Sequence, residues 1–287
     1  MKNSKLLKNT VNVVQSTKFD ISFTILEIGA EDYGETPEGF YELLDYFPGS
    51  KIIGLELDED VCNEMNSKAR KDIQYFPYAL GASNEIRKLH ITNHPMCTSL
   101  YKPNEELLSL YQNMEYANLK TEASVETVSL DHFVKINNIG KIDFIKIDVQ
   151  GAELDIFKGG IKTLNDVLKI VCEVEFIEHY ENQPLFGDVC EFLAKKDLMF
   201  NKFLGLNGRT LKPIFINNNQ NHASQHIWSD AVYIKHVLKI PELDNVKLLK
   251  LAVLSSVYGS IDLVYYCLSI FDKKNSSFLS KSFLETG

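Results

Sequence analysis

Strand-like apolar runs alternate with helical patterns from residue 20 onward, and this alternation most constrains the fold. Residues 22–28 and 51–57 are predicted strands, and helical patterns follow them at residues 37–46 and 60–70. Runs rich in Ile, Val, Phe and Tyr predict further strands at residues 73–78, 142–148 and 170–176, and a final antiparallel strand at residues 231–235. We therefore expect an α/β fold with a doubly wound, mostly parallel sheet covered by helices on both faces.

The chain is long enough for one such core and a smaller element. It has 287 residues, of which 45% are hydrophobic. We expect the main domain at residues 1–239 and a small C-terminal helical appendage at residues 240–287. Two helical patterns in the appendage meet near Gly259, and helices of this length need a surface to pack on. They either cover the main domain or join two copies of the chain in a homo-oligomer.

The composition limits the kinds of binding partner and the cell compartment that we expect for this protein. The 30 basic and 39 acidic residues give a formal charge of −9, which disfavours nucleic acid as a partner. The apolar stretch 251–271 is long enough to span a membrane, but Asp262 and several polar residues interrupt it, so packed helices are expected. The first 20 residues lack a signal-peptide core, and five widely spaced cysteines include no CxxC pair. We expect a cytoplasmic protein without a membrane span.

The loop after the first predicted strand, residues 27–34, lies where α/β folds bind cofactors. A phosphate-binding loop would need a lysine after its second glycine, but Glu35 stands there, so nucleoside triphosphates are disfavoured. A dinucleotide-binding loop would need a third glycine. Its absence weakens the case for NAD as the cofactor without excluding it. S-adenosylmethionine carries a sulfonium and an ammonium group, which Glu27, Glu31 and Asp32 would attract.

Other strand ends present residues that suit this donor. Gly29 allows close backbone approach, and Glu56 can accept hydrogen bonds from both hydroxyls of a ribose. The alternative for Glu56 is a solvated residue within an acidic run. Residues 142–153 run from an apolar strand through Asp148 into a new helix. Asp148 is thereby presented to the cofactor crevice, unless it only caps the helix.

From about residue 24 to residue 235, the chain resembles the FkbM-type S-adenosylmethionine-dependent methyltransferases. The most specific segment is residues 142–154, in which Gln150 stands where the family usually has glutamate. Supporting segments are residues 97–100, 128–131, 173–176 and 231–235. The first loop departs from the family pattern, because Glu27 and Glu31 replace the usual Asp and Asn.

The resemblance implies a Rossmann-like class I methyltransferase fold and S-adenosylmethionine as cofactor. It implies that Glu27, Gly29 and Ala30 line the methionine side of the cofactor and that Glu56 holds its ribose. The remaining predicted cofactor contacts are Leu57, Asp148 and, at the adenine, Ala79 and Leu80.

Methyl transfer to a hydroxyl group needs alignment of the acceptor and removal of its proton by a base or with the help of a metal. Asp148 is the first candidate for either role. In one arrangement, Asp148 and Glu175 hold Mg²⁺, as in the distantly similar catechol O-methyltransferases. In another, Lys146 neutralises a glutamate and His179 is the base. His179 would otherwise be a surface histidine at a helix start.

The predicted function is O-methylation of a hydroxyl on a small molecule or glycan, either a sugar or a secondary metabolite. The preference for sugars comes from the resemblance. One alternative is an NAD(P)-dependent sugar oxidoreductase, which would need a Tyr-x-x-x-Lys proton relay, but Glu115 stands four residues after Tyr111. Another is a non-catalytic binding or assembly protein that uses the C-terminal helices.

Overall fold

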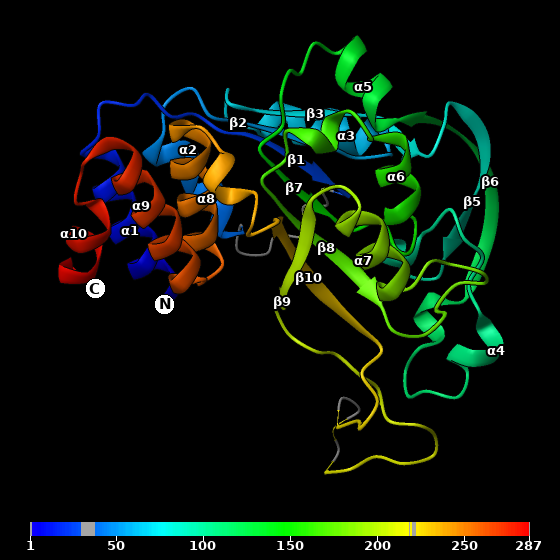
Figure 1. Cartoon of the computed structure of the whole chain (residues 1–287). Coiled ribbons are helices and arrows are strands. Elements are labelled where there is room, and N and C mark those ends of the chain that lie inside the picture. Colours follow the sequence, from blue (N-terminus) through cyan, green and yellow to red (C-terminus); the bar gives the residue numbers. More distant parts are fainter. Residues whose placement is uncertain (1, 30–37, 218, 220–221, 287) are drawn as a thin grey trace.

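The computed structural model describes residues 2–29, 38–217, 219 and 222–286, which form a seven-stranded sheet with helices on both faces (Figure 1). The strands of this sheet are β1 (Thr24–Ile28), β2 (Lys51–Leu55), β3 (Ile73–Phe76), β7 (Phe144–Ile147), β8 (Lys169–Glu175), β9 (Leu198–Phe203) and β10 (Trp228–Lys235). They lie in the order β3-β2-β1-β7-β8-β10-β9, and only β10 runs antiparallel to its neighbours. The predicted Rossmann-like α/β fold with a final antiparallel strand is confirmed.

The centre of the sheet brings three strand ends together. Inner parallel strands are buried on both faces, which explains why β7 is apolar in the sequence except at Lys146. The strand order reverses between β1 and β7, and open α/β sheets bind ligands at such a switch point. Backbone hydrogen bonds continue there from Gly29 N to Leu55 O (3.2 Å) and from Asp148 N to Ile28 O (3.0 Å). The ends of β1, β2 and β7 are therefore held side by side.

Helices cover the sheet from two sides. On one side lie α5 (Leu130–Ile136), α6 (Glu153–Gly159) and α7 (Phe186–Ala194). On the other side lie α1 (Lys2–Gln15), α2 (Leu43–Tyr46), α8 (Asn245–Val257) and α9 (Ile261–Asn275), with α10 (Leu279–Thr286) packed on α1 and α9. The remaining helices are α3 (Glu59–Lys68), which packs on β3, and the short 3₁₀ helices η1 (Gly39–Glu42), η4 (Thr163–Asn165) and η5 (Ile240–Glu242).

The C-terminal helices are part of the packing of the main sheet. α8 and α9 meet near Gly259, as the sequence predicts, and six residues of α8 from Leu248 to Leu254 are fully buried. They share one hydrophobic core with the sheet and with α1, a helix that the sequence analysis did not predict. Of the two roles expected for these helices, they take the first and cover the main domain. The division of the chain at residue 239 stays a prediction.

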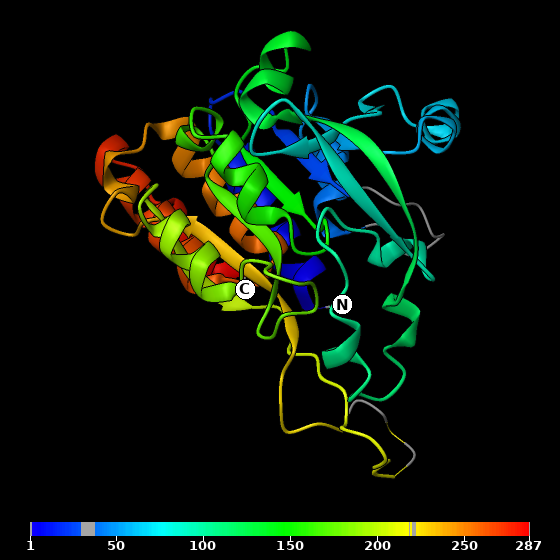
Figure 2. The same ribbon diagram turned by 90° about the vertical axis from the view of Figure 1, so that its right-hand side faces the viewer.

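A second sheet, which was not predicted, lies beside the main one. Its strands are β4 (Ala79–Gly81), β5 (Glu85–Thr92) and β6 (Leu119–Ser129), in the order β4-β6-β5. The connection from β5 to β6 contains η2 (Pro95–Cys97), α4 (Glu105–Leu108) and η3 (Glu115–Ala117). Figure 2 shows β5 and β6 together at the edge of the molecule, with α4 beyond them. We call residues 93–118 the capping segment.

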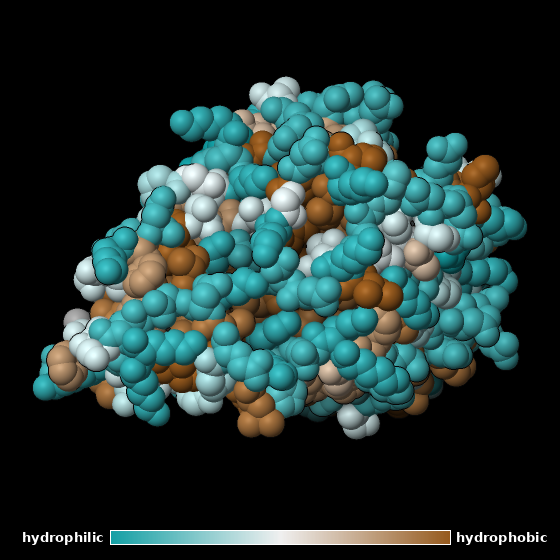
Figure 3. All heavy atoms as spheres, turned by 45° about the horizontal axis from the view of Figure 1, so that its top comes forward, coloured by the Kyte–Doolittle hydropathy of each residue, from teal (hydrophilic) through white to brown (hydrophobic). Residues whose placement is uncertain are grey.

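Polar side chains cover most of the face in Figure 3, with apolar side chains in small patches. Among the described residues, no helix has the length and apolar character needed to cross a membrane. The apolar stretch 251–271 is divided between α8 and α9. The described residues between β9 and β10 project from the body of the molecule (Figure 1).

Candidate functional site

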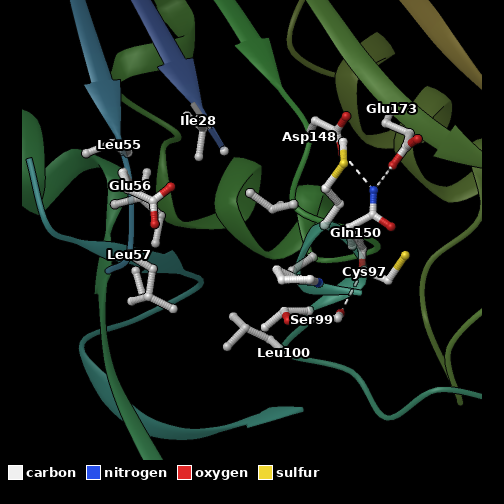
Figure 4. A pocket seen from close by; sticks show the side chains of 18 of the residues that line it. Ile28, Leu55, Glu56, Leu57, Cys97, Ser99, Leu100, Asp148, Gln150 and Glu173 are labelled. Atoms are coloured by element: carbon white, nitrogen blue, oxygen red, sulfur yellow. Dashed lines mark hydrogen bonds between the residues drawn. The ribbon is translucent and has the colours of Figure 1, made fainter. Parts of the chain in front are cut away.

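A cavity of about 930 Å³ opens where β1, β2 and β7 end. Its walls come from these strand ends, from the capping segment, and from residues that follow β8 or begin β10. In Figure 4, Glu56 lies on one side of the cavity, and Asp148 and Glu173 lie on the other. The cavity therefore occupies the switch point of the sheet, where the sequence analysis expected a ligand.

Most residues predicted to bind a cofactor line this cavity. They are Glu27, Gly29, Glu56, Leu57, Ala79, Leu80 and Asp148. Ala30 lies outside the described residues, as do Glu31 and Asp32. Of the residues predicted to be catalytic, Asp148 and His179 are on the cavity wall, whereas Glu175 is not among the wall residues that the structure describes.

Glu27 places a buried acid near the end of β1. Tyr41 donates a hydrogen bond to Glu27 Oε2 (2.5 Å). Burial raises the pKa of Glu27 to about 7, against the effect of this hydrogen bond, and the nearby carboxylate of Glu38 adds to the rise. A cation bound beside Glu27 would favour its ionised form. The charge of this strand end therefore depends on pH and on what occupies the cavity.

Gly29 is required by the close packing of two strand ends. Its φ is +80°, and a Cβ atom there would lie 2.0 Å from the backbone oxygen of Asp148. A side chain at this position would therefore force the two segments apart. The glycine lets the turn after β1 lie directly against the junction between β7 and α6, so that both face the same cavity.

Glu56 follows β2 and is only 8% exposed, so it is not a solvated member of the acidic run. Its Oε1 atom accepts a hydrogen bond from Asp58 N (2.8 Å). Asp58 caps α3 by accepting hydrogen bonds from Asp60 N and Val61 N. These bonds fix the carboxyl group of Glu56 at the cavity wall, where it can accept hydrogen bonds from two neighbouring hydroxyl groups.

Asp148 follows β7 and does not cap the next helix. The N-cap residue of α6 is Ala152, so the alternative interpretation of Asp148 as a cap is wrong. The Asp148 side chain is 38% exposed, and its Oδ2 atom lies 4.0 Å from Lys146 Nζ. An accessible carboxylate thus stands beside a fixed cation at the cavity wall.

Lys146 partly balances an acidic cavity. It forms an ion pair with Asp230 (2.9 Å). Burial by itself lowers the pKa of Lys146, but the carboxylates of Asp148, Asp230 and Glu38 raise it above its ordinary value, so Lys146 stays protonated. Among the described wall residues it is the only lysine or arginine, and it faces six carboxyl groups. They belong to Glu27, Glu38, Glu56, Asp148, Glu173 and Asp230.

Gln150 connects the two carboxyl groups on its side of the cavity (Figure 4). Its Nε2 atom donates hydrogen bonds to Asp148 Oδ1 (2.9 Å) and to Glu173 Oε2 (2.5 Å). Tyr180 donates a hydrogen bond to Gln150 Oε1 (2.9 Å), and Ser99 Oγ donates one to its backbone oxygen (2.6 Å). The sequence analysis singled out Gln150 only as a departure from the family pattern.

β8 carries Glu173 and Glu175 on one face, because they are two residues apart in a strand, and both are surrounded by other carboxyl groups. Burial raises the pKa of each well above its ordinary value, and neighbouring carboxylates, Asp148 among them, raise it further. Burial also raises the pKa of Glu153 to about 7. These side chains therefore tend to hold protons at neutral pH.

The predicted Mg²⁺ site between Asp148 and Glu175 is not supported by this arrangement. Glu175 is 2% exposed and is not among the described residues of the cavity wall. Within the part of the chain that the structure describes, no group of three or more His, Cys, Asp or Glu side chains is arranged to hold a metal ion. The donor set expected for a hard divalent cation is therefore incomplete.

His179 lies in the loop after β8 and not at a helix start. Its Nε2 atom is buried and has no hydrogen-bond partner among the described residues. Burial lowers the pKa of His179 to about 4, and Arg209 contributes to this change. The imidazole is therefore neutral at neutral pH. It can form a hydrogen bond with a ligand in the cavity, but it is a weak base.

The wall opposite the strand ends was largely missed by the sequence analysis. It includes Met96, Leu108, Met114, Tyr116 and Trp228. The motif at residues 97–100 pointed toward this wall, because Cys97 and Ser99 also line the cavity. No pattern pointed to Trp228, which begins β10. The cavity thus has an acidic end at the strand ends and a mainly apolar, aromatic end at the capping segment.

A doubly wound sheet with a large acidic cavity at its switch point defines a Rossmann-like protein that binds its ligands at the strand ends. The sequence matches the Methyltransferase FkbM domain family over residues 27–200, more than half of its length. The chain belongs to this family of methyltransferases, and the predicted resemblance is confirmed.

The chain is also similar to individual proteins. The chain is 28% identical over 197 residues to the 2-O-methyltransferase NoeI of Sinorhizobium fredii (strain NBRC 101917 / NGR234), with 65% of this chain and 77% of that protein covered. The solved structure of the 23S rRNA methyltransferase ErmE is similar with a TM-score of 0.34 and 10% identity, over 91% of this chain and 81% of that one. A putative methyltransferase from Thermoplasma acidophilum gives a TM-score of 0.31 and 10% identity, over 76% of this chain and 70% of that one.

Proposed function

We propose that this protein is an S-adenosylmethionine-dependent methyltransferase that methylates a hydroxyl oxygen. The observation that carries the proposal is the convergence of seven predicted cofactor residues on one acidic cavity at the switch point. The donor is a cation at its sulfonium and ammonium groups, and carboxyl groups outnumber the one lysine among the described wall residues, so the cavity would attract it. Membership of the FkbM methyltransferase family supports the same donor.

The residues at the strand ends fit this donor. Gly29 leaves room for close approach to the backbone, and Glu27 offers a carboxyl group to the ammonium side. Glu56 would hold the ribose hydroxyls, and Ala79 and Leu80 would border the adenine. When bound, S-adenosylmethionine supplies an electrophilic methyl group on its sulfonium.

We assign the acceptance of the proton to Asp148. Asp148 would accept the hydroxyl proton of the acceptor, whose oxygen would take the methyl group that bound S-adenosylmethionine would supply, and the donor would leave as S-adenosylhomocysteine. Lys146 would help to hold Asp148 in place, and His179 on the same cavity wall would help to orient the acceptor. Alignment of this kind supplies roughly 7 to 11 kcal/mol of the rate enhancement.

We propose a sugar hydroxyl, in a glycan or a small glycosylated metabolite, as the acceptor. Tyr116 and Trp228 offer aromatic surface to the apolar face of a sugar ring, while Asp148 and His179 offer polar contacts to its hydroxyls. The name of the relative NoeI specifies methylation at an oxygen. We place the reaction in the cytoplasm, which suits five cysteines that are all free.

Calorimetric titration with S-adenosylmethionine, S-adenosylhomocysteine and NAD tests the donor. We expect the first two to bind and NAD not to bind. Binding of NAD alone would favour a sugar oxidoreductase, and binding of none of the three would favour an assembly protein. Mass spectrometry of a sugar panel incubated with protein and donor would then identify the methylated hydroxyl.

A further inference from the structure

The surroundings of Gln150 fix its side chain in one orientation. Gln150 has a φ of +58°, in the left-handed region, within the turn between β7 and α6. Its backbone oxygen is held by Ser99 and its side-chain oxygen by Tyr180. The amide nitrogen consequently points between Asp148 and Glu173. The opposite orientation would place a carbonyl oxygen against two carboxyl groups, so the chemistry of the neighbours also selects the observed one.

The amide of Gln150 uses both of its N–H groups on these two carboxyl groups. An amide nitrogen offers two donors and no lone pair, so it bridges two carboxylates without itself being a metal ligand. Two carboxyl groups that approach each other need a proton, positive charge or hydrogen-bond donors between them, and the raised pKa of Glu173 means that its carboxyl group tends to hold a proton. Lys146 serves the other oxygen of Asp148 and is itself paired with Asp230. The bridge between Asp148 and Glu173 is therefore made by a neutral side chain.

We propose that Gln150 takes the place that a divalent cation would otherwise fill, so that the Asp148 site works without a metal ion. A glutamate at this position, as in the usual family pattern, would bring a third carboxylate to Asp148 and Glu173. Three carboxylates around one point form a binding site for Mg²⁺ or Mn²⁺. The role of Asp148 in catalysis rests on the proposed function, whereas the place of Gln150 between Asp148 and Glu173 does not.

The experiment compares the wild type with Gln150→Glu. Mn²⁺ binding is measured by electron paramagnetic resonance, and methyl transfer is measured with and without EDTA. We expect wild-type activity to be unaffected by EDTA and its Mn²⁺ binding to be weak. Gln150→Glu should bind one Mn²⁺ ion more tightly, by roughly 100-fold, and should lose activity when EDTA removes it. Gln112→Glu is the control, because it makes the same substitution at a buried glutamine that does not line the cavity.

Three outcomes would overturn the proposal. One is a wild-type enzyme that EDTA inactivates and Mn²⁺ restores, a result that needs no variant to fold. Another is equally tight Mn²⁺ binding by the wild type and Gln150→Glu. The third is a folded Gln150→Glu protein, by circular dichroism, that binds no more Mn²⁺ than Gln112→Glu. Mn²⁺ binding is read without the methyl donor, so failure to bind S-adenosylmethionine would count only against the proposed function.

Discussion

Glu27 makes donor binding sensitive to pH, because burial raises its pKa to about 7 in the unliganded protein. Below this pKa the side chain is protonated and neutral, so it cannot pair with the ammonium group of the donor. We expect the affinity for S-adenosylmethionine to rise between about pH 6 and about pH 8 and to level off above that range. Calorimetry across this range would show the change, and Glu27→Gln should flatten it. An unchanged pH profile in Glu27→Gln would assign the effect to another group.

Replacement of Asp148 should slow turnover and leave donor binding largely unchanged. Asp148→Asn keeps the shape of the side chain but removes its ability to accept a proton. We expect the dissociation constant of S-adenosylmethionine to change little and turnover to fall by about 10²- to 10⁴-fold. Single-turnover rates and calorimetry on the same preparation measure both quantities. Full activity in Asp148→Asn would move the base to another residue, with His179 as the next candidate.

Replacement of Glu56 should weaken donor binding and leave the chemical step unchanged. Hydrogen bonds to a charged group contribute about 1.5 to 3 kcal/mol, so Glu56→Ala should weaken donor binding by roughly 10- to 100-fold. Glu59→Ala changes an exposed member of the same acidic run and should bind the donor normally. Equal affinities of the two variants would mean that Glu56 does not contact the ribose.

The sequence predicted the site residues best where they lie directly at the end of a strand. Glu27, Glu56 and Asp148 were found because the ends of parallel strands meet at one edge of a sheet, whatever their order in the chain. The contacts of Gln150 with Tyr180 and Ser99 could not be predicted in this way. They join segments far apart in the sequence, and their meeting depends on how the loops fold over the sheet.

At the scale of the elements, the first residue of β8, Lys169, makes an unusual contact with Tyr258 of the helical layer. Lys169 is 0% exposed, and its Nζ atom lies 5.0 Å from the centre of the Tyr258 ring. This Nζ atom has no hydrogen-bond partner in the part of the chain that the structure describes. Burial lowers the pKa of Lys169 from 10.5 to about 7.

Replacement of Lys169 should stabilise the protein in a pH-dependent way. Between about pH 7 and its ordinary pKa, the unfolded chain holds the lysine proton and the folded chain does not, so the destabilisation is largest at or below pH 7 and fades as the pH rises. One pKa unit corresponds to about 1.4 kcal/mol. Lys169→Met should therefore raise the free energy of unfolding by a few kcal/mol at pH 7 and by much less near pH 10.

Urea unfolding at the two pH values measures this effect. Lys195→Met is a suitable control, because the Lys195 side chain is 69% exposed. The same stabilisation by Lys169→Met at both pH values, or a loss of stability at both, would show that Lys169 is protonated in the folded protein.

The elements that were missed share a physical reason. β5 and β6 have few buried residues and carry charged residues, so they lack the apolar run that identifies an inner strand. α1 has only a narrow apolar stripe at Leu7, Val11 and Val14, interrupted by polar residues. The parallel strands of the main sheet were predictable because burial on both faces demands continuous apolar sequence.

At the scale of the whole molecule, the terminal helices and the sheet form one hydrophobic core. A fragment that ends at Lys239 would expose the face of the sheet that α8 and α9 cover. We expect this fragment to lose cooperative thermal unfolding and donor binding, since it leaves a large apolar surface in water. Calorimetry and circular dichroism of the fragment would test this. A fragment that still binds S-adenosylmethionine would show that residues 240–287 are a separable appendage.

Because Gly29 has no side chain, the donor side and the acceptor side of the proposed reaction meet at this residue. The backbone that meets the donor and the backbone that carries Asp148 touch at this residue, with no space for an atom between them. A substitution there would shift both at once. Directed evolution toward a new acceptor would therefore have to keep the contact between Gly29 and Asp148. Substitutions in the capping segment would instead change the acceptor side of the cavity without disturbing donor recognition.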